Sequence, residues 1–417
     1  MSGQPIVFSP QSGHNTRVGM SLRSISRRGC LLLAPPALLG ALGISALWPA
    51  ARDRAGRTLA WYQDTAPPTV TIRVPERPVR GVAVVVVEVA DAHDWTIESI
   101  DLDGTPLPAA AGEHWIDTAA LPDGAHVVTV RARDRSAAAN ETIAQASFVS
   151  RNSGPRLDLD PRSTQVGQGQ TLVVRVRTDV PAEVRGTLDG WPLHFVADGL
   201  LNWALAGFDA MTRPGRLRLA LAAVDELGNR SEAAFDVAVT PVRYPNEEVW
   251  LPPATSGLIG SNVNAQEIAR LDRIFAGISP VKRWEGPFLV PVPHPIVSEF
   301  ATGRSYNGGP ITSRHWGTDF DCPVGTPVAA AAAGTVVLAD TLAVRGLAVI
   351  LDHGLGVFSC YYHLSRADVR LGQAVDRGTR IGLSGASGAV TGPHLHWEVR
   401  VRGEAVDPMA WTRTTIP

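Results

Sequence analysis

Three short stretches near the end of this 417-residue chain carry side chains that can bind a metal ion and move protons. His315 and Asp319 stand four residues apart, and His394 and His396 flank a single leucine. His363 ends a third stretch. Neutral imidazole and carboxylate groups are both good zinc ligands, and imidazole also titrates near neutral pH. The set could therefore combine metal binding with acid–base chemistry.

The residues around these groups indicate strands or extended segments. Gly317 and its Thr and Phe neighbours favour extended backbone, in which residues 315, 317 and 319 share one face. Apolar neighbours predict a strand around His394 and His396, whose side chains would then point to the same side. Both imidazoles could meet one metal, or one could bind metal while the other faces substrate. A lone histidine such as His363 is more often a packed residue.

The motifs across residues 287–410 follow one another in an order that resembles the lysostaphin-type zinc endopeptidases, also called β-lytic or LytM-domain metallopeptidases. The motifs that carry the resemblance are His315-x-Gly317-x-Asp319-Phe320, Gly325-Thr326-Pro327-Val328-Ala329-Ala330, Gly334-Thr335-Val336, Asp352-His353-Gly354-x-Gly356, Tyr362-His363-Leu364-Ser365, Gly382-x-Ser384-Gly385, Thr391-Gly392-Pro393-His394-Leu395-His396-Trp397-Glu398 and Val406-Asp407-Pro408.

The resemblance implies a zinc ion, one per chain, held by His315, Asp319 and His396. Three protein ligands leave the fourth tetrahedral position to water, as a catalytic zinc site requires. His363 and His394 would be the catalytic imidazoles, one taking the proton and the other stabilising the oxyanion, and their order stays open.

The implied function is a zinc-dependent endopeptidase that hydrolyses peptide bonds in peptidoglycan cross-links through a zinc-bound water. Peptidoglycan peptides would be its partners. One alternative is a non-catalytic relative that binds peptidoglycan or activates another hydrolase. Another is a peptidase directed at proteins, which would share the same site.

Four further residues near the motifs have simpler interpretations. Tyr306 is expected to line the substrate groove, by resemblance to the family pattern. His353 is expected to be structural and His294 exposed. Asp321 either supports a metal ligand, packs against its neighbours or faces solvent.

Composition limits the class of protein. The length predicts two to four domains, and the 45% of apolar residues can form real cores. A formal net charge of −2 argues against nucleic acid as a partner. The oligomeric state stays open.

Cys322 and Cys360 are the one possible disulfide pair in the last domain, and two buried free thiols are the favoured interpretation.

Residues 1–55 are predicted to be a targeting segment. Arg27 and Arg28 precede an uncharged apolar run, residues 30–48, as in secretory signals and, more loosely, twin-arginine export signals. The run either is cleaved near residue 50 or anchors the chain in a membrane. We therefore expect an exported protein, periplasmic or at the cell surface, with an inner-membrane anchor as one alternative. A cytoplasmic protein with a buried apolar helix is the minority interpretation.

Residues 56–154 and 155–243 share a pattern of alternating strands and turn signals that predicts two immunoglobulin-like β-sandwich modules. The predicted fold class is thus mainly β, with these modules before a compact antiparallel β zinc-peptidase domain at residues 285–417. Asn140 and Asn229 fall at corresponding turns, which explains them better than glycosylation. The scattered histidines show no ligand spacing. The tryptophans are expected to pack, with a carbohydrate platform as the alternative; they are Trp95, Trp115, Trp191 and Trp203.

Residues 244–284 read as a linker with one amphipathic helix over about 265–277. Asn264 is expected to cap this helix, with Glu267 completing the capping box. Gly277 and Pro280 would end it. The helix is expected to pack on a neighbouring domain, and a role as a gate over the active site is the alternative.

Overall fold

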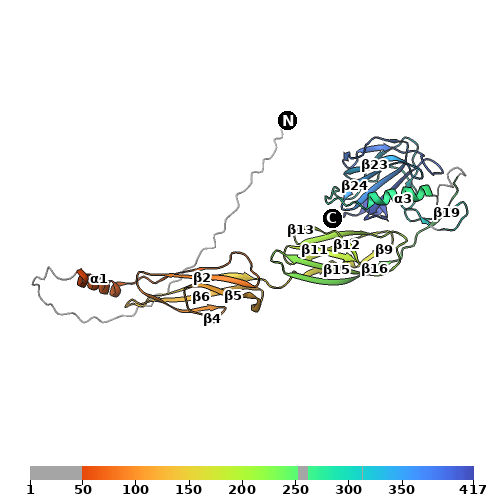
Figure 1. Ribbon diagram of the computed structural model, residues 1–417. Helices are drawn as coiled ribbons and strands as arrows, with labels where there is room; N and C mark the ends of the chain where they lie inside the picture. Colours follow the sequence, from red (N-terminus) through yellow and green to blue (C-terminus); the bar gives the residue numbers. More distant parts are fainter. Residues whose placement is uncertain (1–48, 252–261, 312) are drawn as a thin grey trace, which may run out of the picture. The chain divides into compact units, whose positions relative to one another are not determined.

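The computed structural model describes residues 49–251, 262–311 and 313–417, which are mainly β (Figure 1). The chain divides between Asn152 and Ser153 into two compact units. Residues 1–48, which hold most of the predicted targeting segment, lie outside the described residues. Helix α1 (Pro49–Gln63) opens the described part and was not predicted. No helix of the described ranges is long and apolar enough to cross a membrane.

The first unit contains two antiparallel sheets around one core. Strand β2 alternates buried and less buried residues, and its Ala83, Val85 and Val87 are fully buried. This period of two is what a sheet with one covered face requires. One sheet has the order β1 (Thr69–Arg73), β2 (Val82–Ala90), β5 (Gly112–Asp117), and the other β4 (Thr105–Leu107), β3 (Trp95–Leu102), β6 (Gly124–Asp134), β7 (Glu141–Ser150).

The second unit begins with a similar pair of sheets. Their core joins residues of both sheets, such as Val174 of β10 and Leu219 of β15. One sheet has the order β13 (Val196–Asp198), β14 (Leu201–Gly207), β10 (Thr171–Thr178), β8 (Leu157–Leu159), and the other β12 (Trp191–Leu193), β11 (Ala182–Leu188), β15 (Gly215–Asp225), β16 (Arg230–Thr240), β9 (Gln165–Gly167).

The shared sequence pattern corresponds to shared turns. Asp103 and Gly104 join β3 to β4 with φ of 52° and 82°, and Asp189 and Gly190 join β11 to β12 with φ of 50° and 87°. Two residues with positive φ make the tight hairpin turn for which Asp-Gly is suited.

The two asparagines of the repeat also act in turns. The backbone N–H of Asn140 donates to Asp134 Oδ1 (2.9 Å), and that of Asn229 donates to Asp225 Oδ1 (2.8 Å). Turn geometry thus accounts for both.

The tryptophans differ from one another. Trp203 is buried, as predicted, whereas the prediction of packing is wrong for Trp115 and Trp191, which are 71% and 78% exposed. Both lie at positions of their strands that face solvent.

The C-terminal domain is built on a large antiparallel sheet, seen in blue in Figure 1. A smaller sheet packs beside it, and helix α4 (Pro408–Arg413) follows. The large sheet has the order β18 (Ile296–Ser298), β21 (Thr318–Phe320), β29 (Leu395–Val401), β25 (Val357–Leu364), β24 (Gly346–Gly354), β23 (Gly334–Leu342), β27 (Ala374–Val375), with β30 (Glu404–Val406) beside β29, and the smaller one is β22 (Pro327–Ala329), β28 (Arg380–Leu383), β26 (Arg366–Ala367).

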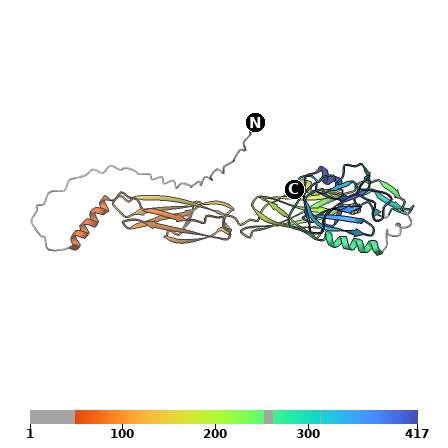
Figure 2. The same ribbon diagram turned by 90° about the horizontal axis from the view of Figure 1, so that it is seen from above.

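The segment predicted as a linker contributes two elements to this domain. Strand β17 (Asn246–Val249) pairs in parallel with β19 (Gly303–Tyr306), which also pairs with β20 (Ser313–Arg314). Helix α3 (Asn262–Phe275) lies along the sheet in both views (Figures 1 and 2). Its Leu271 and Phe275 are buried in one cluster with residues of β23, β24 and β25.

The predicted helix capping is wrong. The helix begins at Asn262 and ends at Phe275, so Asn264 lies inside it. Glu267 is buried and accepts hydrogen bonds from the backbone N–H of Val344 (2.9 Å) and from Arg345 Nη1 (2.7 Å). A buried carboxylate needs such partners, and they replace the capping contact.

The second β module and the C-terminal domain share contacts within the second unit. Trp203 and Leu205 of β14 belong to the same apolar cluster as Trp397 and Val401 of β29. The indole N–H of Trp411 donates to Thr171 Oγ1 (3.1 Å). Both described cysteines, Cys322 and Cys360, are buried and free, as the favoured interpretation expected.

Candidate metal centre and active site

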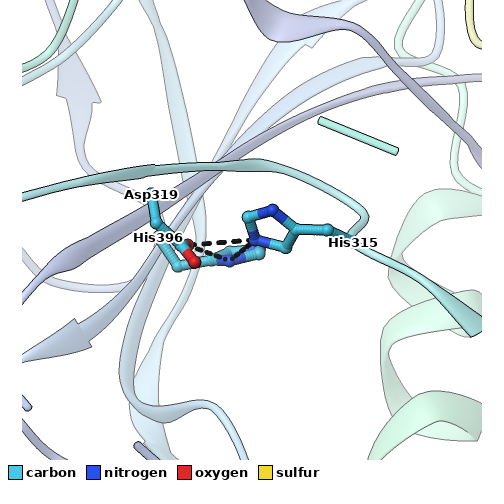
Figure 3. Close-up of side chains that lie close together, drawn as sticks. All are labelled: His315, Asp319 and His396. Carbon is cyan, nitrogen blue, oxygen red and sulfur yellow. Dashed lines mark hydrogen bonds and ion pairs between the residues drawn. The ribbon is translucent and has the colours of Figure 1, made fainter. Parts of the chain in front are cut away.

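Neighbouring strands bring the predicted metal ligands together. Asp319 of β21 stands opposite His396 of β29, and His396 stands opposite Tyr362 of β25. His315 lies in the short connection between β20 and β21. Figure 3 shows the three side chains converging from these elements.

Three atoms form a small triangle. His315 Nε2 lies 3.0 Å from Asp319 Oδ1 and 2.9 Å from His396 Nδ1, and the last two atoms are 2.8 Å apart. All three residues are buried. Tetrahedral zinc ligands at about 2.0–2.1 Å from the ion stand roughly 3.3 Å from one another, so a small outward shift would accommodate the ion.

The outer ring nitrogen of each histidine has an acceptor oxygen. Nδ1 of His315 donates to the carbonyl of Glu299 (3.0 Å), and Nε2 of His396 donates to Glu398 Oε1 (2.9 Å). When both rings are neutral and carry their proton on the outer nitrogen, the inner nitrogens present lone pairs to each other beside a carboxylate oxygen. Three electron-rich atoms at such distances repel unless a cation lies between them, so the donor set fits a zinc ion.

Charge at the centre favours the ionised carboxylates. Burial alone would raise the pKa of Asp319, but protonated His315 and His396 rings beside it would hold that pKa well below its usual range. Burial likewise opposes ionisation of Glu398, whereas Arg400, with Nη2 at 2.7 Å, and His396 lower its pKa. Glu398 thus remains an acceptor for the His396 ring.

His363 and His394 lie beside this triangle without joining it. Their ring centroids are 4.8 Å apart, and His394 Nε2 is 3.8 Å from Asp319 Oδ1. Nδ1 of His363 donates to the carbonyl of Ser387 (2.8 Å), and Nδ1 of His394 donates to that of Gly392 (3.0 Å). In both rings Nε2 is left as the proton acceptor.

The two outer imidazoles are neutral. Burial, together with His394 and His396, lowers the pKa of His363 to about 3, and burial also lowers the pKa of His394. His363 has a φ of 61°, which is uncommon for a residue with a side chain. Its backbone N–H donates to the carbonyl of Arg345 (3.0 Å), which helps to hold this conformation.

A groove of about 730 Å³ passes over the five residues. Tyr306 lines it, as expected, together with Trp250, Trp316 and Ile268. The groove can therefore hold an extended substrate against the metal centre.

The remaining sequence candidates lie away from the centre. His353 is fully buried and bonds the carbonyl of Ala333 (2.7 Å) and Ser359 Oγ (2.7 Å), so the prediction of a structural role is confirmed. Asp321 is exposed, which fits the solvent interpretation. His294 is half-buried, so its predicted exposure is wrong.

Three supporting residues were not predicted. Glu398 follows His396 by two positions in the same strand, so strand alternation could have identified it. Arg304 of β19 contacts Asp319, and Glu247 of β17 contacts Arg304. Nothing in the sequence spacing indicates these two contacts.

One more group of possible ligands occurs in the first unit. Asp64, Asp91 and His93 offer ligand atoms within 4.8 Å of one another, and all three are half-buried. The sequence interpretation missed it because Asp64 follows α1 while the other two lie between β2 and β3.

The buried His–Asp–His triangle with two neutral imidazoles beside it is the arrangement of a hydrolytic metal centre. The sequence model of Peptidase family M23 matches residues 313–408, so the chain carries an M23 domain of the lysostaphin type at its C-terminal end.

Named relatives match about a quarter of the chain. Peptidoglycan DD-endopeptidase ShyA of Vibrio cholerae is 48% identical over 103 residues, which are 24% of this chain and 24% of that protein. DD-carboxypeptidase/endopeptidase Mpg of Neisseria meningitidis is 41% identical over 96 residues, 23% of this chain and 22% of that protein. This chain thus spans about a quarter of the length of the curated relatives it matches.

Among solved structures, the catalytic domain of lysostaphin from Staphylococcus simulans is 28% identical. The match covers 34% of this chain and 98% of that one, with a TM-score of 0.24.

Proposed function

We propose that the C-terminal domain is a zinc-dependent endopeptidase that hydrolyses peptide bonds in peptidoglycan cross-links. The convergence of His315, Asp319 and His396 on one point carries this proposal. The names of the M23 relatives, which are peptidoglycan DD-endopeptidases and a DD-carboxypeptidase/endopeptidase, support the substrate class.

His315, Asp319 and His396 would hold one zinc ion per chain. Bound there, zinc would polarise the scissile carbonyl and acidify water at neutral pH. Three ligands leave the fourth position open toward the groove.

His363 and His394 would act as the catalytic imidazoles. Each presents a bare Nε2, because its Nδ1–H is bonded to a carbonyl. Such a nitrogen can take the proton of the attacking water and, once protonated, can donate to the oxyanion or the leaving amine. Their separation from the triangle keeps them available for this work.

The rest of the chain would deliver the peptidase to the wall. We propose that residues 1–55 direct export, with residues 30–48 as signal or membrane anchor. The β modules at 56–154 and 155–243 would be immunoglobulin-like spacers, residues 244–284 would join them to the peptidase at 285–417, and the protein would act in the periplasm or at the cell surface.

A cleavage assay tests the function. The purified protein, with zinc, is incubated with muropeptides that contain intact peptide cross-links, and the products are separated by mass. We expect monomeric muropeptides from the wild type and none from the protein stripped of metal. If the zinc-loaded wild type binds the wall peptides but never cuts them, the alternative of a binding or hydrolase-activating protein replaces the enzyme.

A further inference from the structure

Arg304 of β19 bridges the metal centre and strand β17. Its Nη2 donates to Asp319 Oδ2 (2.7 Å), and its Nε donates to Glu247 Oε1 (2.8 Å). The side chains of Arg304 and Asp319 are only 17% and 8% exposed. Charge-assisted hydrogen bonds in such a place are short and stronger than surface pairs.

The hydrogen bond from Arg304 determines which oxygen of Asp319 is available to a metal. Oδ1 faces His315 and His396, whereas Oδ2 is occupied by the guanidinium. A carboxylate held in this way offers one oxygen only. If both oxygens were free, the second could fill the coordination position that a catalytic site keeps for water.

Glu247 also contacts Ser298, which lies next to the second ligand, His315. It accepts from Ser298 Oγ at 3.0 Å and 3.1 Å, and Ser298 Oγ lies 3.2 Å from His315 Nδ1. Because the hydroxyl gives its proton to Glu247, its oxygen can accept from Arg304 Nη2 (3.2 Å) and can share with the Glu299 carbonyl the N–H that His315 Nδ1 donates. The Glu247 carboxylate therefore holds Arg304, which contacts Asp319. It also holds Ser298, which lies beside His315.

Glu247 also offsets the positive charge of Arg304. The Arg304 guanidinium stands one carboxylate away from the cation site and would repel a divalent ion. Glu247 places a negative charge on the opposite side of Arg304, at a salt-bridge distance of 2.8 Å. The strand that supplies it lies outside residues 313–408, the part that matches the M23 family.

We infer that Glu247 and Arg304 are positioning residues of the metal centre, through which β17 holds Asp319 as a one-oxygen ligand and strengthens zinc binding. The inference rests on the proposed zinc site but not on cleavage of any substrate. Residues upstream of the matched domain are then part of its metal centre.

Zinc affinity tests the inference directly. The full chain is stripped of metal, and zinc is titrated against a competing chelator for the wild type, Glu247→Gln and Glu248→Gln. We expect Glu247→Gln to weaken zinc binding by about 10- to 100-fold, as for other residues that orient metal ligands. Glu248 is exposed on the neighbouring position of β17, so Glu248→Gln should match the wild type within about twofold.

The visible spectrum of the cobalt-substituted protein gives a second readout. In the double variant Glu247→Gln/Arg304→Met, both half-buried charges are removed together and Asp319 Oδ2 is released. We expect the cobalt bands to weaken, as they do when the coordination number rises above four. Circular dichroism of the metal-free proteins checks folding, and if Glu247→Gln alone is misfolded the double variant decides.

The outcomes separate the two proposals. If the wild type binds no zinc, the proposed function is wrong. If the wild type binds zinc and the folded Glu247→Gln and double variants bind it equally well with unchanged cobalt spectra, the function stands and the positioning role is overturned.

Discussion

The described residues contain two His–Asp groups that could hold a cation, and they differ in what surrounds them. In the C-terminal domain, His315, Asp319 and His396 are all buried. In the first unit, Asp64, Asp91 and His93 are half-buried, and His93 Nδ1 lies 2.8 Å from Asp64 Oδ2 and 3.8 Å from Asp91 Oδ1. Proximity alone does not separate the two groups.

The two groups differ in the contacts made by the atoms of each ligand that face away from the possible cation. Both histidines of the C-terminal group donate their far nitrogen to an acceptor, and Asp319 gives its second oxygen to Arg304. Among the described residues, no such acceptor is found for Nε2 of His93, whose Nδ1 lies directly against Asp64. The His93–Asp64 contact joins the residue that follows α1 to the loop between β2 and β3. A metal centre is therefore recognised by the groups that orient its ligands.

The largest effect is expected from a ligand. His396→Ala removes one of three zinc ligands and leaves Glu398 without its histidine partner. Zinc content should fall from about one per chain to near zero, and cross-link cleavage should be lost with it. Metal analysis after dialysis measures this, and full zinc retention in the variant would exclude His396 as a ligand.

The next largest effect is expected from the outer imidazoles. His363→Ala and His394→Ala should each retain about one zinc per chain but lose about 10²- to 10⁴-fold in cleavage rate, the usual contribution of acid–base groups. Zinc content and cleavage rate are measured on the same samples. Loss of zinc in either variant would show that the ring helps to bind the metal.

His353 offers a third case, a buried histidine with two hydrogen-bond partners and no ligand role. Burial lowers its pKa from 6.5 to about 4. Between those pH values the unfolded chain binds a proton that the folded protein does not, so stability falls as pH falls through this window. The loss amounts to about 3 kcal/mol at full extent.

Urea unfolding of the metal-free protein between pH 4.5 and 7 measures this loss. His353→Gln should unfold more easily at neutral pH but show a weaker pH dependence. An unchanged pH dependence would mean that His353 keeps its ordinary pKa in the fold.

The smallest effect is expected from the first unit. His93→Ala should leave zinc content and cleavage unchanged and lower stability by no more than about 1 kcal/mol, as for a partly exposed pair. Metal analysis and thermal unfolding measure both. A fall of one zinc per chain in this variant would make the first unit a second metal centre.

The sequence predicts the parts of the site that lie close together along the chain. His396 lies in β29 and His394 directly precedes that strand, and the order of the motifs links both to His315 and Asp319. It also predicts the alternating strands and turns of residues 56–154 and 155–243, because these depend on local spacing and backbone conformation.

Contacts between distant segments could not be predicted in this way. Glu247 and Arg304 are 57 residues apart, and Glu267 and Arg345 are 78 apart. Glu267 fits a local capping pattern, but the buried contact with Arg345 is stronger and determines its place. The residues that position the metal ligands are brought there by packing between distant segments. The spacing of residues within one segment does not predict such contacts.

Anomalous diffraction at the zinc edge, from crystals of the zinc-loaded protein, tests the central claim most directly. We predict one strong peak at about 2.0–2.2 Å from His315 Nε2, Asp319 Oδ1 and His396 Nδ1. Absence of a peak there, or a peak only at Asp64, Asp91 and His93, would contradict the account.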